Sequence, residues 1–371
     1  MKAKKRISVY VNSEGIEPSG YYRILQYLID KERVQVHSLF SNRMFCWWHA
    51  LKNNERVCYS PLVFLIVFIR TLLFLIMDSI TLRHGIVIVS RYIMPHYISY
   101  LHLWLLRRIL QKNRLIWDFD DNILEVRSIS RLEFDFLSRY SSTIIVTSDF
   151  LKSLVSVPYQ DKVYLMPTTD GDMQGLYTEE LLANRKENYL KKLILVWVAT
   201  ASNLVYMERV VGEIDKAAFR LREQLGKELV LKIVCNKPLC YKAKYLTLEN
   251  IKWERKRAQQ EMAYAHVGIM PLVSNRFTLG KGGFKLVQYL SVGLPLLASD
   301  VGFNKEIVTS QCGYLIEDSE NLGGWSMGIM HMASDWNLYR NLCDGAIEQY
   351  ETKFSYTENL RVWKYLCEFG D

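Results

Sequence analysis

The stretch from 278 to 302 constrains the fold of this chain more than any other. It reads TLGKGGFKLVQYLSVGLPLLASDVG and opens with a turn that contains Gly280, Gly282 and Gly283. The amphipathic pattern over 284–292 predicts a helix, and Gly293 ends that pattern. The apolar run over 294–299 then predicts a short buried strand. Turn, helix, turn and strand in this order form one step of a parallel α/β sheet.

The same turn is a candidate site for an anion. The first backbone N–H groups of a helix have no partner within the helix and lie at the positive end of its dipole. Glycines let a ligand approach this backbone closely. Lys281 and Lys285 add positive charge, and Phe284 is the first residue of the predicted helix. The pattern predicts a cradle for phosphate or pyrophosphate; the alternative is a glycine loop before an ordinary surface helix.

Short apolar runs rich in β-branched residues recur along the chain and alternate with helical patterns. In the first half they cover 7–11, 85–90, 114–117, 143–148 and 163–166. In the second half they cover 193–198, 229–234, 250–253, 267–271, 294–299 and 312–316. Strands that alternate with helices predict parallel sheets buried on both faces. A chain of 371 residues is long enough for two such domains, so the predicted fold class is α/β with two doubly wound, Rossmann-like domains.

We expect the boundary between the domains in a polar stretch over 170–190. The predicted N-terminal domain covers 1–175, and the predicted C-terminal domain covers 190–352. The last segment, 353–371, has the pattern of a terminal helix.

Positive charge is concentrated near the N-terminus. The formal net charge is +8, but residues 1–114 hold 17 Lys and Arg against 6 Asp and Glu, a net +11. A basic region favours an anionic partner. The sequence has no zinc-finger spacing, RNA-binding signature or basic-region heptad, so we expect no nucleic acid. An anionic membrane surface is the candidate partner.

Residues 61–77, PLVFLIVFIRTLLFLIM, form the most apolar run of the chain. Seventeen residues is the lower limit for a membrane span, and a charge such as Arg70 near the centre is costly in lipid. The run predicts a helix buried in the N-terminal domain, with a helix in the membrane interface or a true span as alternatives. The seven cysteines include no Cys-x-x-Cys pair and no secretory leader is evident, which favours a cytoplasmic setting, with peripheral attachment at the inner membrane face as an option.

Two groups of polar residues follow strands of the predicted N-terminal domain, where parallel sheets bind ligands. The loop after 7–11 contains Gly15, Ser19 and Gly20, so we expect this loop beside a bound ligand. Arg23 stands in the next helix, where it would contact an anion or remain a solvated arginine. Asp120 and Asp121 follow the strand over 114–117. These two carboxylates would hydrogen-bond a hydroxyl group of a ligand, bind a divalent metal ion, or cap the next helix.

Further candidates lie in the predicted C-terminal domain. Thr200 and Asn203 follow the strand over 193–198 and precede a helix, a position suited to a second phosphate contact. Arg276 stands just before the glycine turn, where it would add charge or remain a surface arginine.

The order of turn, helix, Gly-x-Pro at 293–295, strand and Asp-x-Gly at 300–302 resembles the donor-binding segment of family 4 retaining glycosyltransferases, which have the GT-B fold. The usual family pattern has two glutamates eight residues apart, at the positions where this chain has Gly280 and Gln288. Members that make bacterial surface polysaccharides look similar here, with Gly-Lys, Phe-Lys and Gln-Tyr. The resemblance implies two domains facing a cleft, with the loop that contains Ser19, Gly20 and Arg23 on the acceptor side. It also implies a terminal helix that crosses back to the first domain.

The resemblance also implies a function. The chain would transfer a hexosyl group, with retention, from a nucleotide-sugar to a hydroxyl of a saccharide acceptor. By analogy with the family, this acceptor would be lipid-linked, and the reaction would belong to the synthesis of capsule or a similar polysaccharide. Lys281, Lys285 and the backbone at 282–284 would stabilise the leaving diphosphate, and Gln288 would hydrogen-bond a ribose hydroxyl. The nucleotide-sugar is a substrate, so no cofactor is expected, and such a site needs no metal.

Three alternatives stay open. A nucleotide-sugar epimerase of the same architecture would need no acceptor. A non-catalytic, membrane-docked protein that binds nucleotide-sugars would carry Gly280 and Gln288 as marks of lost activity. A nicotinamide-dependent oxidoreductase is the least favoured, because no Gly-x-Gly-x-x-Gly follows the first strand.

Overall fold

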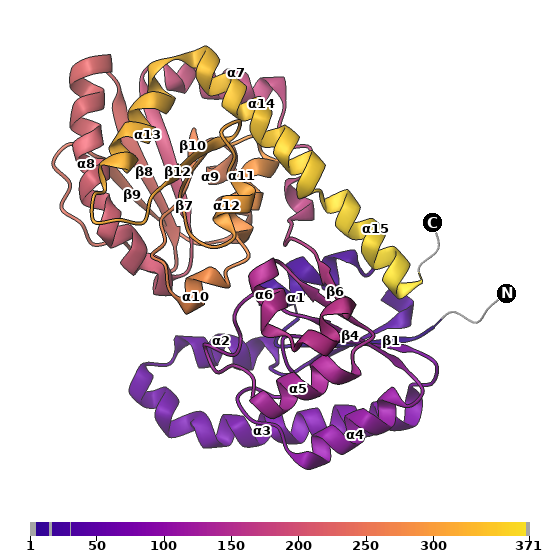
Figure 1. The fold of residues 1–371 in the computed structure, drawn as a ribbon. Coiled ribbons are helices and arrows are strands. Elements are labelled where there is room, and N and C mark those ends of the chain that lie inside the picture. Colours follow the sequence, from indigo (N-terminus) through magenta and orange to yellow (C-terminus); the bar gives the residue numbers. More distant parts are fainter. Residues whose placement is uncertain (1–4, 15–16, 30, 369–371) are drawn as a thin grey trace. The chain divides into compact units, whose positions relative to one another are not determined.

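The computed structural model describes residues 5–14, 17–29 and 31–368, so Gly15 lies outside the described residues. It divides into two compact units (Figure 1). The N-terminal unit comprises Met1–Thr168 with Thr357–Asp371, and the C-terminal unit comprises Thr169–Tyr356. Each unit is built on a sheet of six parallel strands. The predicted class, α/β with two doubly wound domains, is confirmed.

The N-terminal sheet has the order β2-β1-β3-β4-β5-β6. Its strands are β1 (Ile7–Val11), β2 (Val34–Ser38), β3 (Ile86–Ser90), β4 (Arg114–Asp118), β5 (Thr143–Val146) and β6 (Val163–Leu165). The sequence pattern missed β2. This edge strand reads VQVHS, and only one of its residues is fully buried, so it lacks the continuous apolar run of the central strands.

Helices cover both faces of this sheet. They are α1 (Pro18–Arg23), α2 (Asn42–Ala50), α3 (Asn53–Thr81), α4 (Tyr100–Leu110), α5 (Arg131–Tyr140), α6 (Asp149–Leu154) and α15 (Tyr356–Cys367). Helices α3, α4 and α5 pack against one face through alternate strand residues such as Val87 and Leu115. Helix α15 packs on the same unit, because Trp363 is fully buried and the side-chain amide of Asn359 donates to the Pro167 carbonyl at 2.8 Å.

Helix α3 corrects the expectation for residues 61–77, which predicted a helix buried in the core. One side of α3 is buried through Val63, Val67, Thr71 and Leu75, but the other side is exposed and equally apolar. Arg70 lies within the continuous helix, and its charged side chain has a polar partner, because Nη2 donates to the Ser38 carbonyl at 2.8 Å. In the described part of the chain one helix, Asn54–Thr81, is long and apolar enough to cross a membrane, and 22% of its most apolar window is buried.

The C-terminal sheet has the order β12-β11-β10-β7-β8-β9. Its strands are β7 (Lys192–Val198), β8 (Glu228–Cys235), β9 (Thr247–Lys252), β10 (Val267–Met270), β11 (Leu296–Ser299) and β12 (Gly313–Ile316). Its helices are α7 (Glu179–Tyr189), α8 (Leu204–Leu225), α9 (Arg255–Ala263), α10 (Arg276–Leu279), α11 (Phe284–Ser291), α12 (Asn304–Ile307), α13 (Gly323–Ser334) and α14 (Trp336–Lys353).

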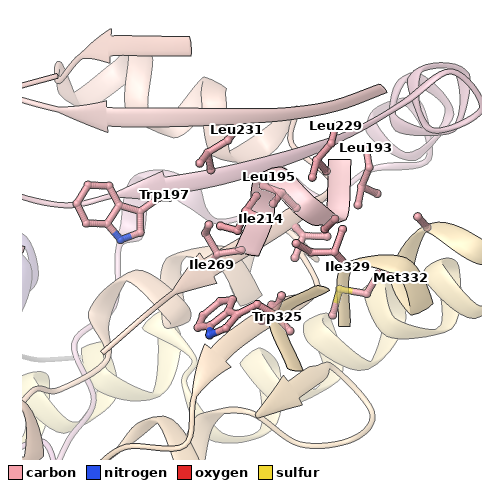
Figure 2. Close-up of a cluster of buried hydrophobic side chains, with 14 of the residues drawn as sticks. Leu193, Leu195, Trp197, Ile214, Leu229, Leu231, Ile269, Trp325, Ile329 and Met332 are labelled. Atoms are coloured by element: carbon pink, nitrogen blue, oxygen red, sulfur yellow. The ribbon is translucent and has the colours of Figure 1, made fainter. Parts of the chain in front are cut away.

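Alternate residues of the C-terminal strands face opposite layers of helices. Figure 2 shows Leu193, Leu195 and Trp197 of β7 on the side of the sheet that packs with Ile214 of α8 and Trp325 of α13. The intervening residues of β7 pack with α11 on the other side. Burial on both faces explains why these strands appear in the sequence as unbroken apolar runs.

The segment over 170–190 differs from the expected linker. It belongs to the C-terminal unit and contains helix α7, whose sequence EELLANRKENY is polar apart from a few positions. Only Leu181, Leu182, Arg185 and Tyr189 of this helix are buried. A narrow buried side on a polar helix gives little periodic signal, so composition alone suggested a linker.

Candidate functional site

The candidate residues lie where the strand order of each sheet reverses. In the C-terminal sheet the reversal falls between β7 and β10, which gives the strand order of dinucleotide-binding domains. In the N-terminal sheet it falls between β1 and β3. Open parallel sheets bind ligands outside the carboxyl ends of their strands at such points. The two sites are described separately, beginning with the C-terminal unit.

The glycine turn between α10 and α11 requires glycine at its last position. Gly283 has a φ of +63° and is the N-cap of α11. A Cβ atom on Gly283 would lie 2.2 Å from Cδ1 of Ile307. Gly302, with φ +55°, packs a second turn against the α10 backbone, where a Cβ would lie 3.1 Å from Leu279 Cα. These two glycines bring the turns close together and hold the start of α11 at the carboxyl edge of the sheet.

Helix α11 is anchored at its middle and at its end. The hydroxyl of Tyr289 accepts a hydrogen bond from the Val198 N–H at 3.0 Å, and its ring lies against Gly268 so closely that a Cβ there would be 2.3 Å away. The guanidinium of Arg185, from α7, donates to the carbonyls of Val292 and Gly293 at 2.8 Å. Arg185 therefore caps the C-terminal end of α11, a role that the sequence analysis did not foresee.

Lys281 and Lys285 both lie at the glycine turn, as expected. The ammonium of Lys281 lies 4.6 Å from the centre of the Phe277 ring, and that of Lys285 lies 4.8 Å from the centre of the Phe284 ring. Burial lowers the pKa of Lys285 to about 8, although the nearby Asp170 opposes the shift. A lysine with this pKa is partly neutral near pH 8 and gains from an added anion.

Gln288 differs from its expected role because both ends of its amide have partners inside the unit. Lys285 Nζ donates to Oε1 at 2.7 Å, and the Gln288 Nε2 donates to Asp170 Oδ2 at 2.7 Å. Gln259 Nε2 reaches the same Asp170 oxygen at 3.3 Å. Gln288 thus links Lys285 to a buried carboxylate, and this fits positioning of the lysine better than direct contact with a ribose.

The other C-terminal candidates lie beside the turn, because β7 and β10 are neighbours. Thr200 Oγ1 accepts from the amide of Asn203 at 2.9 Å and lies 3.0 Å from Ser202 Oγ. Ser202 and Asn203 belong to a short 3₁₀ turn that precedes α8, and Thr200 is the N-cap of that turn. Arg276 is exposed in α10, whose N-cap is Asn275.

In the N-terminal unit, Arg91 forms hydrogen bonds with three of the candidate residues. It follows β3 with a φ of +64° and donates to Asp120 Oδ1 at 2.9 Å, Asp121 Oδ2 at 2.7 Å and Ser19 Oγ at 2.7 Å. Ser19 in turn donates to Asp120 Oδ2 at 2.9 Å. The sequence analysis did not include Arg91 in the site, although it directly follows the predicted strand over 85–90.

Glu17 is the third carboxylate near Arg91, with 3.7 Å between Oε1 and Nη1. Its Oε2 accepts the Gly20 N–H at 2.7 Å, which fixes the predicted acceptor-side loop. Burial raises the pKa of Glu17 above its usual value, although Arg91 opposes the shift. Burial acts in the same direction on Asp120, but Arg91 and then Arg23 outweigh it and lower the pKa of Asp120.

Arg23 differs from the expectation that it contacts an anion. Its side chain is fully buried, with Nη2 at 2.6 Å from Asp118 Oδ1 and Nε at 2.9 Å from Oδ2. Its Nη1 donates to the Met166 carbonyl and to Thr168 Oγ1. Arg23 is a structural residue that joins α1 to the ends of β4 and β6. Among the described residues, no three His, Cys, Asp or Glu side chains are arranged to hold one metal ion.

Comparison with solved structures finds the fold of nearly the whole chain in known glycosyltransferases. A structure of HepE (Alr3699) from Anabaena with UDP and glucose has a TM-score of 0.65 at 10% identity, covering 99% of this chain and 100% of that one. Sucrose-phosphate synthase from Thermosynechococcus elongatus has a TM-score of 0.61 at 11% identity, covering 98% of both chains. The chain has the GT-B fold.

A third GT-B structure covers less. The pneumococcal O-GlcNAc transferase GtfA with UDP and GlcNAc has a TM-score of 0.55 at 15% identity, over 81% of this chain and 59% of that one. No protein-family model matches the sequence, and no curated protein matches it either. At these identities the likeness establishes the fold alone, so membership of family 4 and retention stay predictions.

Proposed function

We propose that this GT-B chain transfers a sugar from a nucleotide-sugar to a hydroxyl group of an acceptor. The observation that carries the proposal is the glycine turn at the start of α11, held at the strand-order reversal of the C-terminal sheet with Lys281 and Lys285 beside it. The HepE and GtfA structures contain UDP, so we propose a UDP-sugar as the donor.

The chemistry follows from where negative charge develops. When the bond between the sugar and the diphosphate breaks, charge builds on the leaving phosphate. The backbone N–H groups at 282–284 and the ammonium groups of Lys281 and Lys285 would stabilise this charge, with Gly280 and Arg276 lining the approach. The link from Lys285 through Gln288 to Asp170 would hold the ammonium in place before the donor binds. Thr200 and Asn203, on the neighbouring strand end, would complete the donor contacts.

The acceptor would bind at the N-terminal unit. Asp120 has a lowered pKa and is ionised at neutral pH, so it would accept a hydrogen bond from an acceptor hydroxyl. Asp121 and Ser19 share Arg91 with it and would position the same group. Glu17, whose pKa is raised by burial, is the carboxyl of this cluster best suited to exchange a proton with the acceptor.

The finer assignment is part of the same proposal. The transfer would be of a hexosyl group with retention, to a lipid-linked saccharide, in the synthesis of capsule or another surface polysaccharide. The reaction would take place at the cytoplasmic face of a membrane to which the chain attaches peripherally, and it would not require a metal ion.

The first test is thermal stabilisation by UDP, GDP, ADP and their sugar conjugates. We expect UDP to stabilise the wild type and the Lys281→Ala/Lys285→Ala variant to lose this shift. Lys216→Ala is the matched control, because Lys216 is an exposed lysine of α8 that pairs with Glu213, three residues earlier in the same helix. A well-folded wild type that no nucleotide stabilises would overturn the proposal.

Turnover separates the remaining alternatives. Release of UDP that depends on an added saccharide acceptor supports transfer. Isomerisation of the UDP-sugar without an acceptor would instead identify an epimerase. Tight binding of UDP-sugar with neither reaction, across a broad panel of acceptors, would favour a binding protein.

A further inference from the structure

Helix α3 exposes a continuous apolar row on its outer side. Seven large aliphatic residues of this side have exposed fractions between 38% and 66%; they are Leu62, Leu65, Ile66, Ile69, Leu73, Ile76 and Ile80. Six of them follow one another at spacings of four and three residues, so they form a nearly straight row along the helix. Eighteen residues separate the ends of the row, which is about 27 Å long at the helical rise.

The row continues onto the neighbouring helix α4. The rings of Phe64 and Tyr97 lie 6.4 Å apart, and the Thr71 hydroxyl lies 2.8 Å from His102 Nε2, so α3 and α4 are packed together. Exposed residues of this second segment are Tyr97, Tyr100, Leu101 and Trp104. Figure 1 shows the two helices along the same side of the N-terminal unit. We call the seven aliphatic residues and these four the α3–α4 surface. Soluble monomers seldom expose an apolar patch of this extent.

The exposed charges between residues 56 and 112 are all positive, and Glu55, at the start of α3, is an exposed acidic residue just outside this stretch. Between residues 56 and 112 the only acidic residue is Asp78, which is buried and bonded to Tyr10 and His37. The exposed cations of the same segment are Arg83, Arg107, Arg108 and Lys112. Arg108 lies over the ring of Trp104, at 5.7 Å from its centre. Apolar side chains bordered by arginine, lysine, tyrosine and tryptophan have the composition of a surface that enters a lipid interface.

We propose that the α3–α4 surface docks on an anionic lipid bilayer, with α3 lying in the plane of the membrane. A span is disfavoured because the inner side of α3 is fixed to the sheet by Val67, Leu75 and the Asp78–Tyr10 hydrogen bond. A second copy of the chain is a poorer occupant. Two copies joined through this surface would bring the same cations together, with no exposed acidic residue between 56 and 112 to pair with them. The inference stands on the surface itself, and only the use of the bilayer as a source of lipid-linked acceptor rests on the proposed function.

Co-flotation of the full chain with vesicles tests the proposal. We expect the wild type to float with phosphatidylglycerol–phosphatidylcholine vesicles and to bind phosphatidylcholine vesicles less. Leu65→Glu/Ile69→Glu/Leu73→Glu should reduce flotation at least tenfold, since all three side chains point outward. Leu190→Glu/Tyr264→Glu/Met327→Glu places the same charges at exposed apolar positions of the C-terminal unit and should float like the wild type.

A second variant keeps the test decisive if the three glutamates disturb folding. Arg107→Ala/Arg108→Ala/Lys112→Ala should remove most of the preference for anionic vesicles, and salt should weaken the wild type but change this variant little. No flotation of the wild type, or unchanged flotation of both variants, would overturn the proposal. So would a wild-type dimer in light scattering that the three glutamates dissociate while vesicles do not bind.

UDP binding in solution, measured on the same proteins, keeps the two proposals apart. If the wild type floats but binds no nucleotide, the docking proposal is supported and the transferase proposal is overturned. If the wild type binds UDP but does not float, the docking proposal is overturned and the transferase proposal stands.

Discussion

The two strand-order reversals of this molecule are built from different chemistry. At the reversal of the C-terminal sheet, a turn of glycines and the start of α11 present backbone groups and two lysines. At the reversal of the N-terminal sheet, the polar groups are side chains, with Arg91 bonded to Asp120, Asp121 and Ser19. A strand-order reversal therefore carries a cradle suited to phosphate in one unit and a carboxylate cluster suited to hydroxyl groups in the other.

The two units also bury an arginine in different ways. Arg23 pairs with the carboxylate of Asp118, whereas Arg185 bonds the carbonyls of Ala263, Val292 and Gly293. The first arrangement balances two charges, and the second satisfies the end of a helix with one charge. Removing an arginine should accordingly cost more in the N-terminal unit, where a charge is left behind.

The largest expected effect is that of Arg23→Met on stability. Breaking a buried ion pair by removing one partner costs about 3–5 kcal/mol, because the other charge stays buried without compensation. Adding Asp118→Leu should restore much of this loss, because it removes the stranded carboxylate. Guanidinium unfolding followed by tryptophan fluorescence measures both. If the double variant is no more stable than Arg23→Met, the cost does not come from the ion pair.

Gly283→Ala should be next in size and should act on the C-terminal unit. A residue with a Cβ in the left-handed region costs about 1–3 kcal/mol, and here the added atom would also lie 2.2 Å from Ile307. We expect a lower unfolding midpoint and weaker UDP binding. Ile307→Ala removes the clash but not the backbone strain, so Gly283→Ala/Ile307→Ala should recover only the part due to packing. Unchanged UDP binding in a folded Gly283→Ala protein would contradict a cradle at this turn.

Arg91→Lys tests whether the carboxylate cluster serves the acceptor. A lysine keeps the charge but cannot hold Asp120, Asp121 and Ser19 at once, and hydrogen bonds to charged groups contribute about 1.5–3 kcal/mol. We expect kcat/KM for the acceptor to fall about 10- to 100-fold while UDP binding stays as in the wild type. A loss of UDP affinity without a loss of acceptor turnover would reverse the roles given to the two units.

The sequence predicted most of the fold because the central strands are buried on both faces and appear as continuous apolar runs. It missed β2, an edge strand with mixed residues, and α7, whose buried side is narrow. It predicted a buried core helix at 61–77, since an apolar run does not reveal which of its sides has a partner. Half of that helix is instead exposed.

The candidate site was predicted where neighbouring residues in the sequence act together and missed where distant ones do. The glycines and lysines of 280–285 stand in one motif. Asp170 lies 118 positions from Gln288, and Arg91 lies about 30 from Asp120, so no local pattern joins either pair. Strand order supplies the missing link for Arg91, because it places the end of β3 between the ends of β1 and β4. The family pattern has a glutamate at the position of Gln288, and Asp170 at 2.7 Å gives a physical reason for the amide here, since a second carboxylate would be repelled.

The smallest expected effect is a dependence of UDP affinity on pH, and it is specific to the C-terminal unit. Burial lowers the pKa of Lys285 to about 8, so the side chain is mostly neutral at pH 9 and mostly charged at pH 7. A bound diphosphate favours the ammonium and raises this pKa. Binding at pH 9 should therefore take up nearly one proton, and affinity should fall by up to tenfold per pH unit above about pH 8. Calorimetry in buffers of different ionisation enthalpy measures the uptake. Lys285→Arg, which stays charged, should bind UDP without proton uptake, whereas Arg91→Lys should show the same proton uptake as the wild type. Equal proton uptake by the wild type and Lys285→Arg would contradict a place for Lys285 in the phosphate site.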